Sequence, residues 1–274
     1  MRFVAVGDVM VDVICAELPL AGTRVHADVS VRAGGSAVNA ARAAASAGAS
    51  AAVLGRIGND PAGELVLAHL EATRISSYLG RDDELSTGTA VAFPGPTVVA
   101  TRGANARFGT GDVPATIDAE ALFVSGFALF QEGSAEAATV AIDRFSGDIV
   151  GIDLGSPNLA RVARQTQIPL ARRTVVFATA EEAAAMTDAS PEDAARALAS
   201  TFSVACVKLG EDGAVAVADG ELERCRSERV ARRSPFGAGD AFAGVFLVAL
   251  AMGDSLRSAL DRACDAGARA VSAS

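Results

Sequence analysis

The sequence predicts a doubly wound α/β fold, in which helices cover both faces of a mostly parallel sheet. Short apolar runs rich in β-branched residues alternate with alanine-rich stretches along nearly the whole chain. Continuous apolar runs of this length are typical of strands that are buried on both faces. The chain has 274 residues, half of them hydrophobic, which is enough to bury a full core. We therefore expect a single domain over residues 1–274.

Each element of this fold has its own local signal. Three helices are expected to begin after Asp60, Ser134 and Ser190, because these side chains accept hydrogen bonds from the exposed amides of a first helical turn. A further helix is expected over residues 36–47. The alternation of strand and helix predicts parallel strands joined by helical crossovers. The predicted strands cover residues 2–7, 51–57, 121–125, 148–153, 174–177 and 203–209.

Two stretches interrupt the alternation, within residues 12–33 and 86–103. Each contains strand-like segments that are joined by proline and glycine turns, with no helix between them. This pattern predicts antiparallel hairpins. They form either a small sheet that projects from the core as a lid or ordinary hairpins at the edge of the large sheet.

Composition and charge exclude several classes of protein. There are 33 acidic and 24 basic residues, a net charge of −9, which argues against a nucleic-acid partner. The one basic cluster, residues 224–233, is interrupted by Glu228, and we interpret it as a solvated strand edge. No leader and no apolar run of about 18 residues is present, so no membrane partner is expected. The four cysteines show no C-x-x-C spacing, which predicts a cytoplasmic protein with reduced thiols.

Lys208 is the only lysine among the basic residues. The G-x-x-x-x-G-K-[ST] phosphate loop is excluded, because the chain contains no Gly-Lys pair. A lysine Schiff-base enzyme would have to use Lys208. The two histidines, His26 and His69, exclude a histidine-rich metal site.

Two other sequence patterns lead to no enzyme class. The letters GDSL at residues 253–256 match a serine esterase motif, but both histidines lie upstream and the motif joins two predicted helices. We interpret Ser255 as a helix cap. The first strand is not followed by G-x-G-x-x-G, which excludes a nicotinamide site of the usual kind.

The segment FGAGDAFAGVFLV, residues 236–248, carries the most chemical information. Gly237 and Gly239 precede a long apolar helix, so free amides and the helix dipole make an anion site there. Asp240 would repel a phosphate, and its presence is explained if it takes a proton from a hydroxyl that attacks the phosphate. The alternative is a plain helix start with a stabilising acid in its first turn. Phosphate binding on backbone amides and a helix dipole needs no lysine, so such a site is compatible with a chain that has a single one.

A second glycine-centred segment, RAGGSAVNA, covers residues 32–40. A glycine pair before a helix lets the backbone approach a small polar ligand, and Asn39 both donates and accepts hydrogen bonds. The alternative is a glycine turn with a polar helix residue. Asp8 and Asp12 follow the first strand, where open α/β sheets bind ligands, and a carboxylate such as Asp12 suits vicinal hydroxyls.

Together these segments resemble the ribokinase-like, or PfkB-type, carbohydrate kinases. The resemblance covers nearly the whole chain and includes VGDVMVDVI, AGGSAVNAA, GRIGNDPAG, TGTAV, RGAN, VKLGEDGAV and FGAGDAFAG. It implies an α/β core with a small β lid, and transfer of the γ-phosphoryl group of MgATP to a hydroxyl of a sugar or nucleoside.

The resemblance also implies roles for individual residues. Asp240 is the expected catalytic base, with an anion hole from the amides of Gly237, Ala238 and Gly239. Glu182 is expected to organise Mg²⁺. The residues expected to contact the acceptor are Asp12, Gly34, Gly35, Asn39, Arg102 and Asn105, and those expected on the nucleotide side are Thr179, Lys208, Gly210, Gly213 and Phe236.

Three departures from the family pattern weaken parts of this expectation. Thr179 stands where relatives carry asparagine, three residues before the glutamate. Ser234, Pro235 and Phe236 replace the usual Asp-Thr-Thr segment, which puts a monovalent-cation (K⁺) site in doubt. The sequence ends at Ser274, so a differently built adenine site is expected.

The leading hypothesis is therefore an ATP- and Mg²⁺-dependent kinase of a sugar or sugar derivative. The alternatives are a nucleoside kinase of the same fold and a sugar-binding or regulatory homologue with weakened catalysis. A lid with unpaired strand edges also predicts a homodimer through those edges.

Overall fold

The computed structural model describes residues 1–94, 97–227 and 236–272. Over these residues the chain forms a large sheet in the order β13-β12-β11-β10-β9-β8-β1-β4-β5. Seven neighbouring strands from β5 to β11 run parallel, and β12 and β13 are added antiparallel at one edge. The strands are β1 (Arg2–Val6), β4 (Ser50–Gly58), β5 (Ser76–Asp82), β8 (Ala121–Ser125), β9 (Ile149–Asp153), β10 (Arg173–Thr179), β11 (Val204–Lys208), β12 (Ala214–Ala218) and β13 (Glu221–Cys225).

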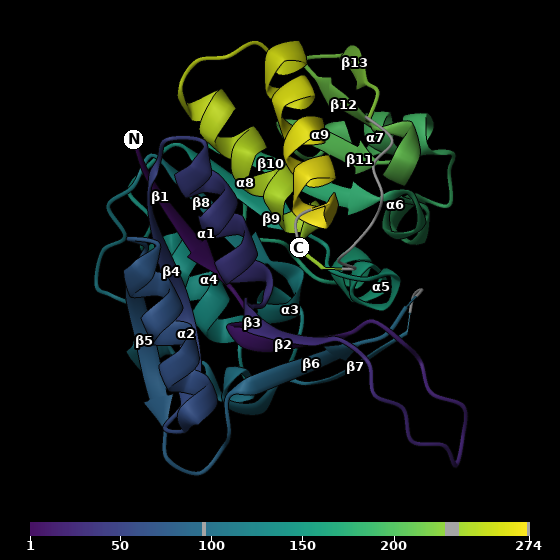
Figure 1. Cartoon of the computed structure of the whole chain (residues 1–274). Helices are drawn as coiled ribbons and strands as arrows, with labels where there is room; N and C mark the ends of the chain where they lie inside the picture. The colour runs from purple at the N-terminus through teal and green to yellow at the C-terminus, as the bar shows by residue number, and fades with distance from the viewer. Residues whose placement is uncertain (95–96, 228–235, 273–274) are drawn as a thin grey trace.

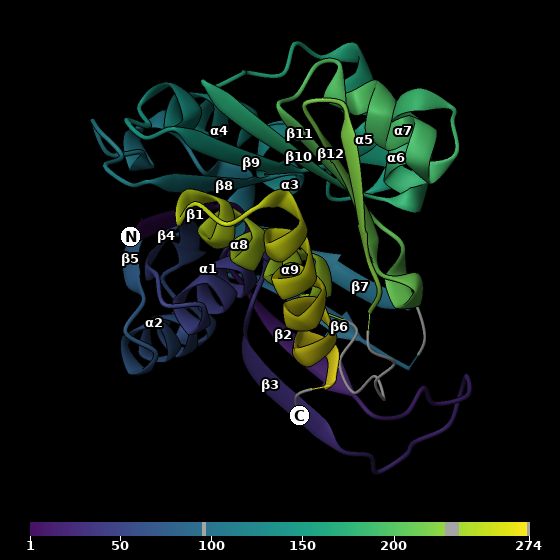
Figure 2. The same cartoon turned by 90° about the horizontal axis from the view of Figure 1, so that it is seen from above.

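Helices cover both faces of this sheet, which confirms the predicted fold class (Figure 2). Alanines and large apolar side chains from each helix fill the two core layers. One face is covered by α1 (Ser36–Ser46), α2 (Pro61–Ala72), α8 (Ala238–Ala251) and α9 (Leu256–Ser272). The other is covered by α3 (Gly126–Leu129), α4 (Ala135–Asp143), α5 (Pro157–Gln165), α6 (Ala180–Thr187) and α7 (Pro191–Ala199).

The predicted helix starts are found with one difference. Asp60 caps α2 by accepting from the amide of Gly63, and Ser190 caps α7 by accepting from the amide of Asp193. Ser134 also lies at the start of α4, but its hydroxyl donates to the carbonyl of Ala128 and makes no cap bond. The side chain is 1 % exposed and turns inward to satisfy the buried carbonyl. The cap predicted at Ser255 is confirmed, because its hydroxyl accepts from the amide of Ser258.

A second sheet has the order β3-β2-β6-β7 and projects from the layered core (Figure 1). The pairs β2–β3 and β6–β7 are antiparallel, as predicted, but β2 and β6 pair in parallel. The two hairpins therefore lie side by side in one mixed sheet. We call this sheet the lid; it comprises β2 (Met10–Cys15), β3 (Val29–Gly34), β6 (Gly88–Ala92) and β7 (Val98–Thr101).

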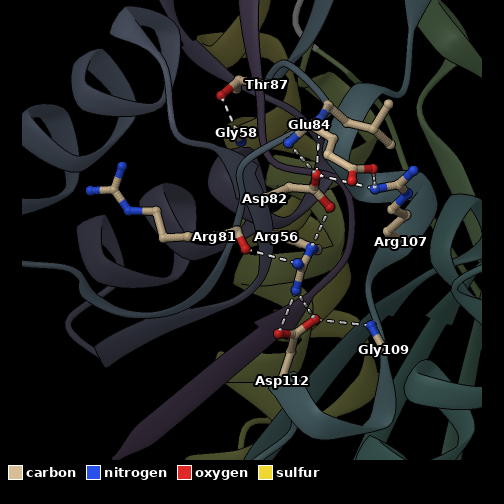
Figure 3. A network of polar contacts seen from close by, with 10 residues as sticks. Arg56, Gly58, Arg81, Asp82, Glu84, Thr87, Arg107, Gly109 and Asp112 are labelled. Atoms are coloured by element: carbon tan, nitrogen blue, oxygen red, sulfur yellow. Dashed lines mark hydrogen bonds and ion pairs between the residues drawn. The ribbon is translucent and has the colours of Figure 1, made fainter.

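A charged network holds the segments that lead into the lid (Figure 3). Arg56 of β4 donates to the carboxylates of Asp82, at 3.2 Å, and Asp112, at 2.8 and 3.0 Å. Asp82 also accepts from the amides of Glu84 and Leu85, which fixes the turn after β5. The turn leads directly into β6, so this network sets where the lid leaves the core.

Two cysteines correct the expectation of reduced thiols. Cys225 at the end of β13 and Cys264 of α9 form a disulfide. They are 39 residues apart, and the packing of α9 on β13 brings them together, which their spacing in the sequence does not reveal. Cys15 and Cys206 are free.

Among the described residues, no helix is both long enough and apolar enough to span a membrane. The basic cluster is described only in part. Arg224 lies on the edge strand β13 with its guanidinium paired to Glu192, as expected of a solvated edge, and residues 228–233 lie outside the described ranges.

Candidate active site

The first turn of α8 forms the centre of the site. Gly237 precedes it in the left-handed conformation, with φ of 88°, which favours glycine. A side-chain carbon at Gly244 would lie 2.5 Å from the carbonyl oxygen of Ala40, so glycine there allows α1 and α8 to touch. This close packing brings Asn39 of α1 beside Asp240 of α8. The anion hole from the amides of the first turn stays a prediction.

Asp240 has the environment of a base that works near neutral pH. Its Oδ2 accepts a 3.1 Å hydrogen bond from Nδ2 of Asn39. Burial and then the charge of Asp153 raise the pKa of Asp240 to about 7, while the bond from Asn39 and the charge of Lys208 act in the opposite direction. A carboxylate with this pKa is able to take up and release a proton at physiological pH.

Lys208, predicted on the nucleotide side, lies beside the first turn of α8. Its Nζ lies 2.5 Å from Oδ2 of Asp153, and only 3.0 Å from the position that a side-chain carbon on Gly239 would occupy. Burial lowers the pKa of the Lys208 ammonium, but the charges of Asp153 and Glu182 raise it by more, so the group stays charged. The single lysine of the chain therefore adds a full positive charge to the first turn of α8.

Thr179 and Glu182 bond to each other at the start of α6. The Thr179 hydroxyl accepts from the Glu182 amide at 3.2 Å, and the Thr179 amide donates to Oε2 of Glu182 at 2.8 Å. A threonine thus supports the helix start where asparagine was expected. Burial and the charge of Asp153 raise the pKa of Glu182, so two neighbouring carboxylates share this corner with Lys208.

The carboxylates of Glu182 and Asp153 would provide part of the coordination shell of a divalent cation. Mg²⁺ in kinases commonly takes one or two protein carboxylates and completes its shell with phosphate oxygens and water. Within the described residues no group of three or more acidic, histidine or cysteine side chains forms a metal site. The protein therefore offers a partial site that fits a metal brought by a nucleotide.

A cavity of about 520 Å³ opens beside Lys208 and the first turn of α8. It is bounded by the ends of β10 and β11, by η3 (Gly210–Asp212) and by α9. Four of the five residues predicted on the nucleotide side line it, and they lie next to the predicted anion hole. The lining includes Thr179, Lys208, Gly210, Gly213, Gly239 and Cys264.

The predicted acceptor residues gather on the lid side of α8. A side-chain carbon on Gly34 would lie 2.1 Å from Oδ2 of Asp12, so the Asp12 carboxylate lies directly over this glycine. Gly35 has φ of 87° and lies against the carbonyl of Asp8, again without room for a side chain. Asp12 is 2 % exposed, and burial raises its pKa to about 6.

Arg102 and Asn105 are committed to protein contacts in this structure. Arg102 donates to both oxygens of Asp8, at 3.0 and 3.3 Å, and to the Ser134 hydroxyl at 2.9 Å. Asn105 exchanges hydrogen bonds with the backbone of Val9 and donates to the carbonyl of Arg102. Both residues fix the segment between the first strand and the lid, and their substrate contacts stay predictions.

Two nucleotide-side expectations stay predictions as well. Phe236 directly precedes Gly237 but does not line the cavity, where Phe242 lies instead. The expectation of a doubtful K⁺ site falls on Ser234 and Pro235, which lie outside the described residues. Asp153 was not predicted from the sequence, although it is the last residue of the buried strand β9, at the edge of the sheet where Asp8 follows β1.

The family comparison decides the class of protein. A model of the pfkB family of carbohydrate kinases matches residues 2–274. The chain belongs to this family. As a pfkB-family kinase it is a phosphotransferase with an alcohol acceptor, which acts on sugars or nucleosides.

Individual relatives of this pfkB-family kinase differ in what they act on. A 2-dehydro-3-deoxygalactonokinase of Haloferax volcanii is 28 % identical over 266 residues, covering 88 % of this chain and 83 % of the relative. A fructokinase of Vibrio cholerae, solved with fructose, ADP and calcium, superposes with a TM-score of 0.81 at 24 % identity, over 99 % of this chain and 93 % of that one.

A second solved structure belongs to another kind of acceptor. The aminoimidazole riboside kinase of Salmonella enterica, complexed with its riboside and an ATP analogue, has a TM-score of 0.82 at 21 % identity, over 100 % and 94 % of the two chains. At these identities the structural neighbours of the pfkB-family kinase establish the shared fold, with its layered core and small second sheet.

Proposed function

We propose that this protein transfers the γ-phosphoryl group of ATP to a hydroxyl of a sugar or sugar derivative, with Asp240 as the general base. The observation that carries the proposal is the position of Asp240, between the Asn39 amide and the charges of Lys208 and Asp153, with a pKa of about 7. The nucleotide-bound neighbours and the cavity beside α8 support ATP as the donor.

In the proposed reaction, the acceptor hydroxyl lies between Asp240 and the lid. Asp240 takes its proton while the hydroxyl oxygen forms a bond to the γ-phosphorus, and the bond from that phosphorus to the leaving oxygen of ADP breaks. During the transfer, the negative charge on the phosphoryl group would be stabilised by the amides of Gly237, Ala238 and Gly239 and by the ammonium of Lys208. These groups are already in place, so little reorganisation opposes the transfer.

The two carboxylates of Glu182 and Asp153 would hold Mg²⁺ on the nucleotide side, because they are the type of ligand that this ion takes from a protein. The ion would supply a charge that neutralises the phosphate oxygens. Asp153 has a second task in this proposal, because its 2.5 Å contact keeps the Lys208 ammonium beside Gly239. Asp12 and Asn39 would orient the acceptor through its hydroxyls.

A sugar-binding protein with weakened catalysis is the competing proposal, motivated by Thr179. The bonds between Thr179 and Glu182 favour the kinase, because they keep the helix start without the expected asparagine. The test is ADP formation with MgATP over a panel of pentoses, hexoses, sugar acids and nucleosides. Sugar binding by calorimetry with no ATP binding and no turnover would favour the competing proposal, and turnover of nucleosides alone would identify a nucleoside kinase.

We also propose a homodimer through the lid. Four valines lie side by side across its strands, Val31, Val13, Val91 and Val99, on the face opposite to Asp12. Val31 and Val99 are 53 % and 63 % exposed, an apolar stripe that a second copy would cover. Sedimentation should give a dimer that Val31→Lys dissociates, and a monomeric wild-type protein would reject this arrangement.

A further inference from the structure

Two arginines from different elements flank the proposed acceptor site. Arg32 of β3 is paired in register with Asp12 of β2, and its Nε lies 3.9 Å from Oδ2 of that carboxylate. Arg42 lies one turn after Asn39 on α1 and donates from Nη2 to the Asn39 oxygen at 2.8 Å. Since the Asn39 amide nitrogen bonds to Asp240, one side chain separates the Arg42 guanidinium from the proposed base.

The fold holds these two positive charges close together. Burial lowers the pKa of Arg42, and the charge of Arg32 lowers it further, while Asp12 and Asp240 act in the opposite direction. Nearby His69 of α2 has a pKa lowered by burial and by the same two arginines, so its imidazole is neutral at pH 7. Bringing like charges together in a partly buried site is unfavourable unless an anion joins them.

The carboxylate nearest to the two arginines, that of Asp12, forms no hydrogen bond to them through Oδ2. Oδ2 of Asp12 is buried and accepts no hydrogen bond within the described part of the chain. Asp240 is reserved as the base in the proposed reaction. Arg42 differs from Arg102 in the charge of its partner. The guanidinium of Arg102 donates to the carboxylate of Asp8, whereas that of Arg42 donates to the neutral oxygen of Asn39.

We propose that Arg42 and Arg32 form a subsite for a carboxylate of the acceptor, so that the protein takes a sugar acid in preference to a neutral sugar. The inference rests on the proposed function, because the subsite adjoins its base. A planar carboxylate matches the guanidinium fork and brings a single negative charge. A phosphate dianion would place a second negative charge near Asp12 and Asp240, so the surroundings favour the carboxylate.

Binding without nucleotide tests this subsite separately from catalysis. Calorimetry on the full chain compares galactonate with galactose and gluconate with glucose, and includes glucose 6-phosphate as a phosphate probe. We expect at least one acid to bind about tenfold or more tightly than its neutral partner, and to weaken with added salt. Equal binding of neutral sugars, no binding of either acid, or tightest binding of glucose 6-phosphate would overturn the subsite. Acid binding without any phosphate transfer would instead reject the kinase.

Substitution of the arginines tests which residues make the preference. Arg42→Met and, separately, Arg32→Met should reduce the preference for acid over neutral sugar by about 10- to 100-fold, as expected for a lost charged hydrogen bond. Arg161→Met is the matched control, because Arg161 bonds to Asn158, three residues earlier on the exposed face of α5, at 2.9 Å. If Arg42 only orients Asn39, affinity for both sugars falls together and the unchanged preference overturns the proposal.

Discussion

The amide nitrogen of Asn39 donates a 3.1 Å hydrogen bond to Oδ2 of Asp240, across 201 positions of sequence. This bond joins the two glycine-centred helix starts, because α1 carries the asparagine and α8 the carboxylate. It also links the acceptor side of the site to the phosphate side. The orientation of the proposed base therefore depends on how tightly α1 and α8 pack at Gly244.

Replacing the proposed base should stop turnover without loss of fold. In Asp240→Asn the side chain keeps its size but cannot take a proton, so kcat should fall by about 10²- to 10⁴-fold. ADP release measured under saturating substrate checks this, with circular dichroism as the control for folding. Turnover within a few-fold of the wild type would reject the role of Asp240.

The raised pKa of Asp240 also predicts how activity depends on pH. The base must be deprotonated, so kcat/KM should fall about tenfold for each unit of pH below about 7 and level off above it. The pH profile of ADP formation, taken where the protein remains folded, measures this. A rate that is flat between pH 5.5 and 8 would contradict the assignment.

The same shift predicts a stability difference with a definite sign. Between about pH 4 and 7 the unfolded chain releases the Asp240 proton while the folded protein retains it, so the native state becomes relatively less stable as pH rises. Asp240→Asn lacks this effect. Its Tm should therefore exceed that of the wild type increasingly from pH 4 to pH 7 and by a constant amount above, as thermal unfolding at several pH values would reveal.

Much of the site could be predicted because glycine-rich helix starts are local patterns. The glycines in the segments around Gly35 and Gly237 predict, from the sequence alone, that the backbone comes close to a ligand. Asp153 has no such pattern, and it reaches Lys208 only because β9, β10 and β11 are adjacent, with Phe177 and Thr179 in register between them. Lys208 was predicted on the nucleotide side, but its ion pair with Asp153 was not, for the same reason.

The strands also differ in how well the sequence predicts them. The central strands are continuous apolar runs, and their positions agree with the structure to within two residues. The edge strands β5, SSYLGRD, and β13, ELERC, are largely exposed and carry polar residues, so no burial pattern marks them. The parallel pairing of β2 with β6 is a contact between distant hairpins, which neither hairpin encodes alone.

Removing the single lysine should weaken catalysis through lost charge at the anion hole. Lys208→Met should lower kcat by about 10²- to 10³-fold, because the ammonium lies beside Gly239 where the phosphoryl group would pass. Lys208→Met also leaves Asp153 buried without its cation, which lowers stability. Adding Asp153→Asn should restore the Tm, while turnover stays low because the double variant also lacks a proposed Mg²⁺ ligand. Recovery of activity in the double variant would show that Lys208 acts only through stability.

The network at the base of the lid should contribute to stability. Arg56→Met leaves Asp82 and Asp112, whose side chains are 3 % and 13 % exposed, without their shared partner. The free energy of unfolding should fall by more than it does when an exposed ion pair is broken, although Asp82 keeps its bonds from the amides of Glu84 and Leu85. Urea unfolding measures this, with Arg164→Met as the control, since its exposed pair with Asp188 should be worth under about 1 kcal/mol. Equal losses in both variants would contradict a special role for the network.

Gly34 should be needed for acceptor binding because the Asp12 carboxylate lies over its backbone. In Gly34→Ala the new methyl group would lie 2.1 Å from Oδ2 of Asp12, so this buried side chain must move. The KM for the acceptor should rise by about tenfold or more, since hydrogen bonds from its hydroxyls to a charged group are lost. The control is Gly111→Ala, where no atom lies within 4 Å of the added carbon and φ is not positive. An unchanged acceptor KM in Gly34→Ala would remove Asp12 from the acceptor site.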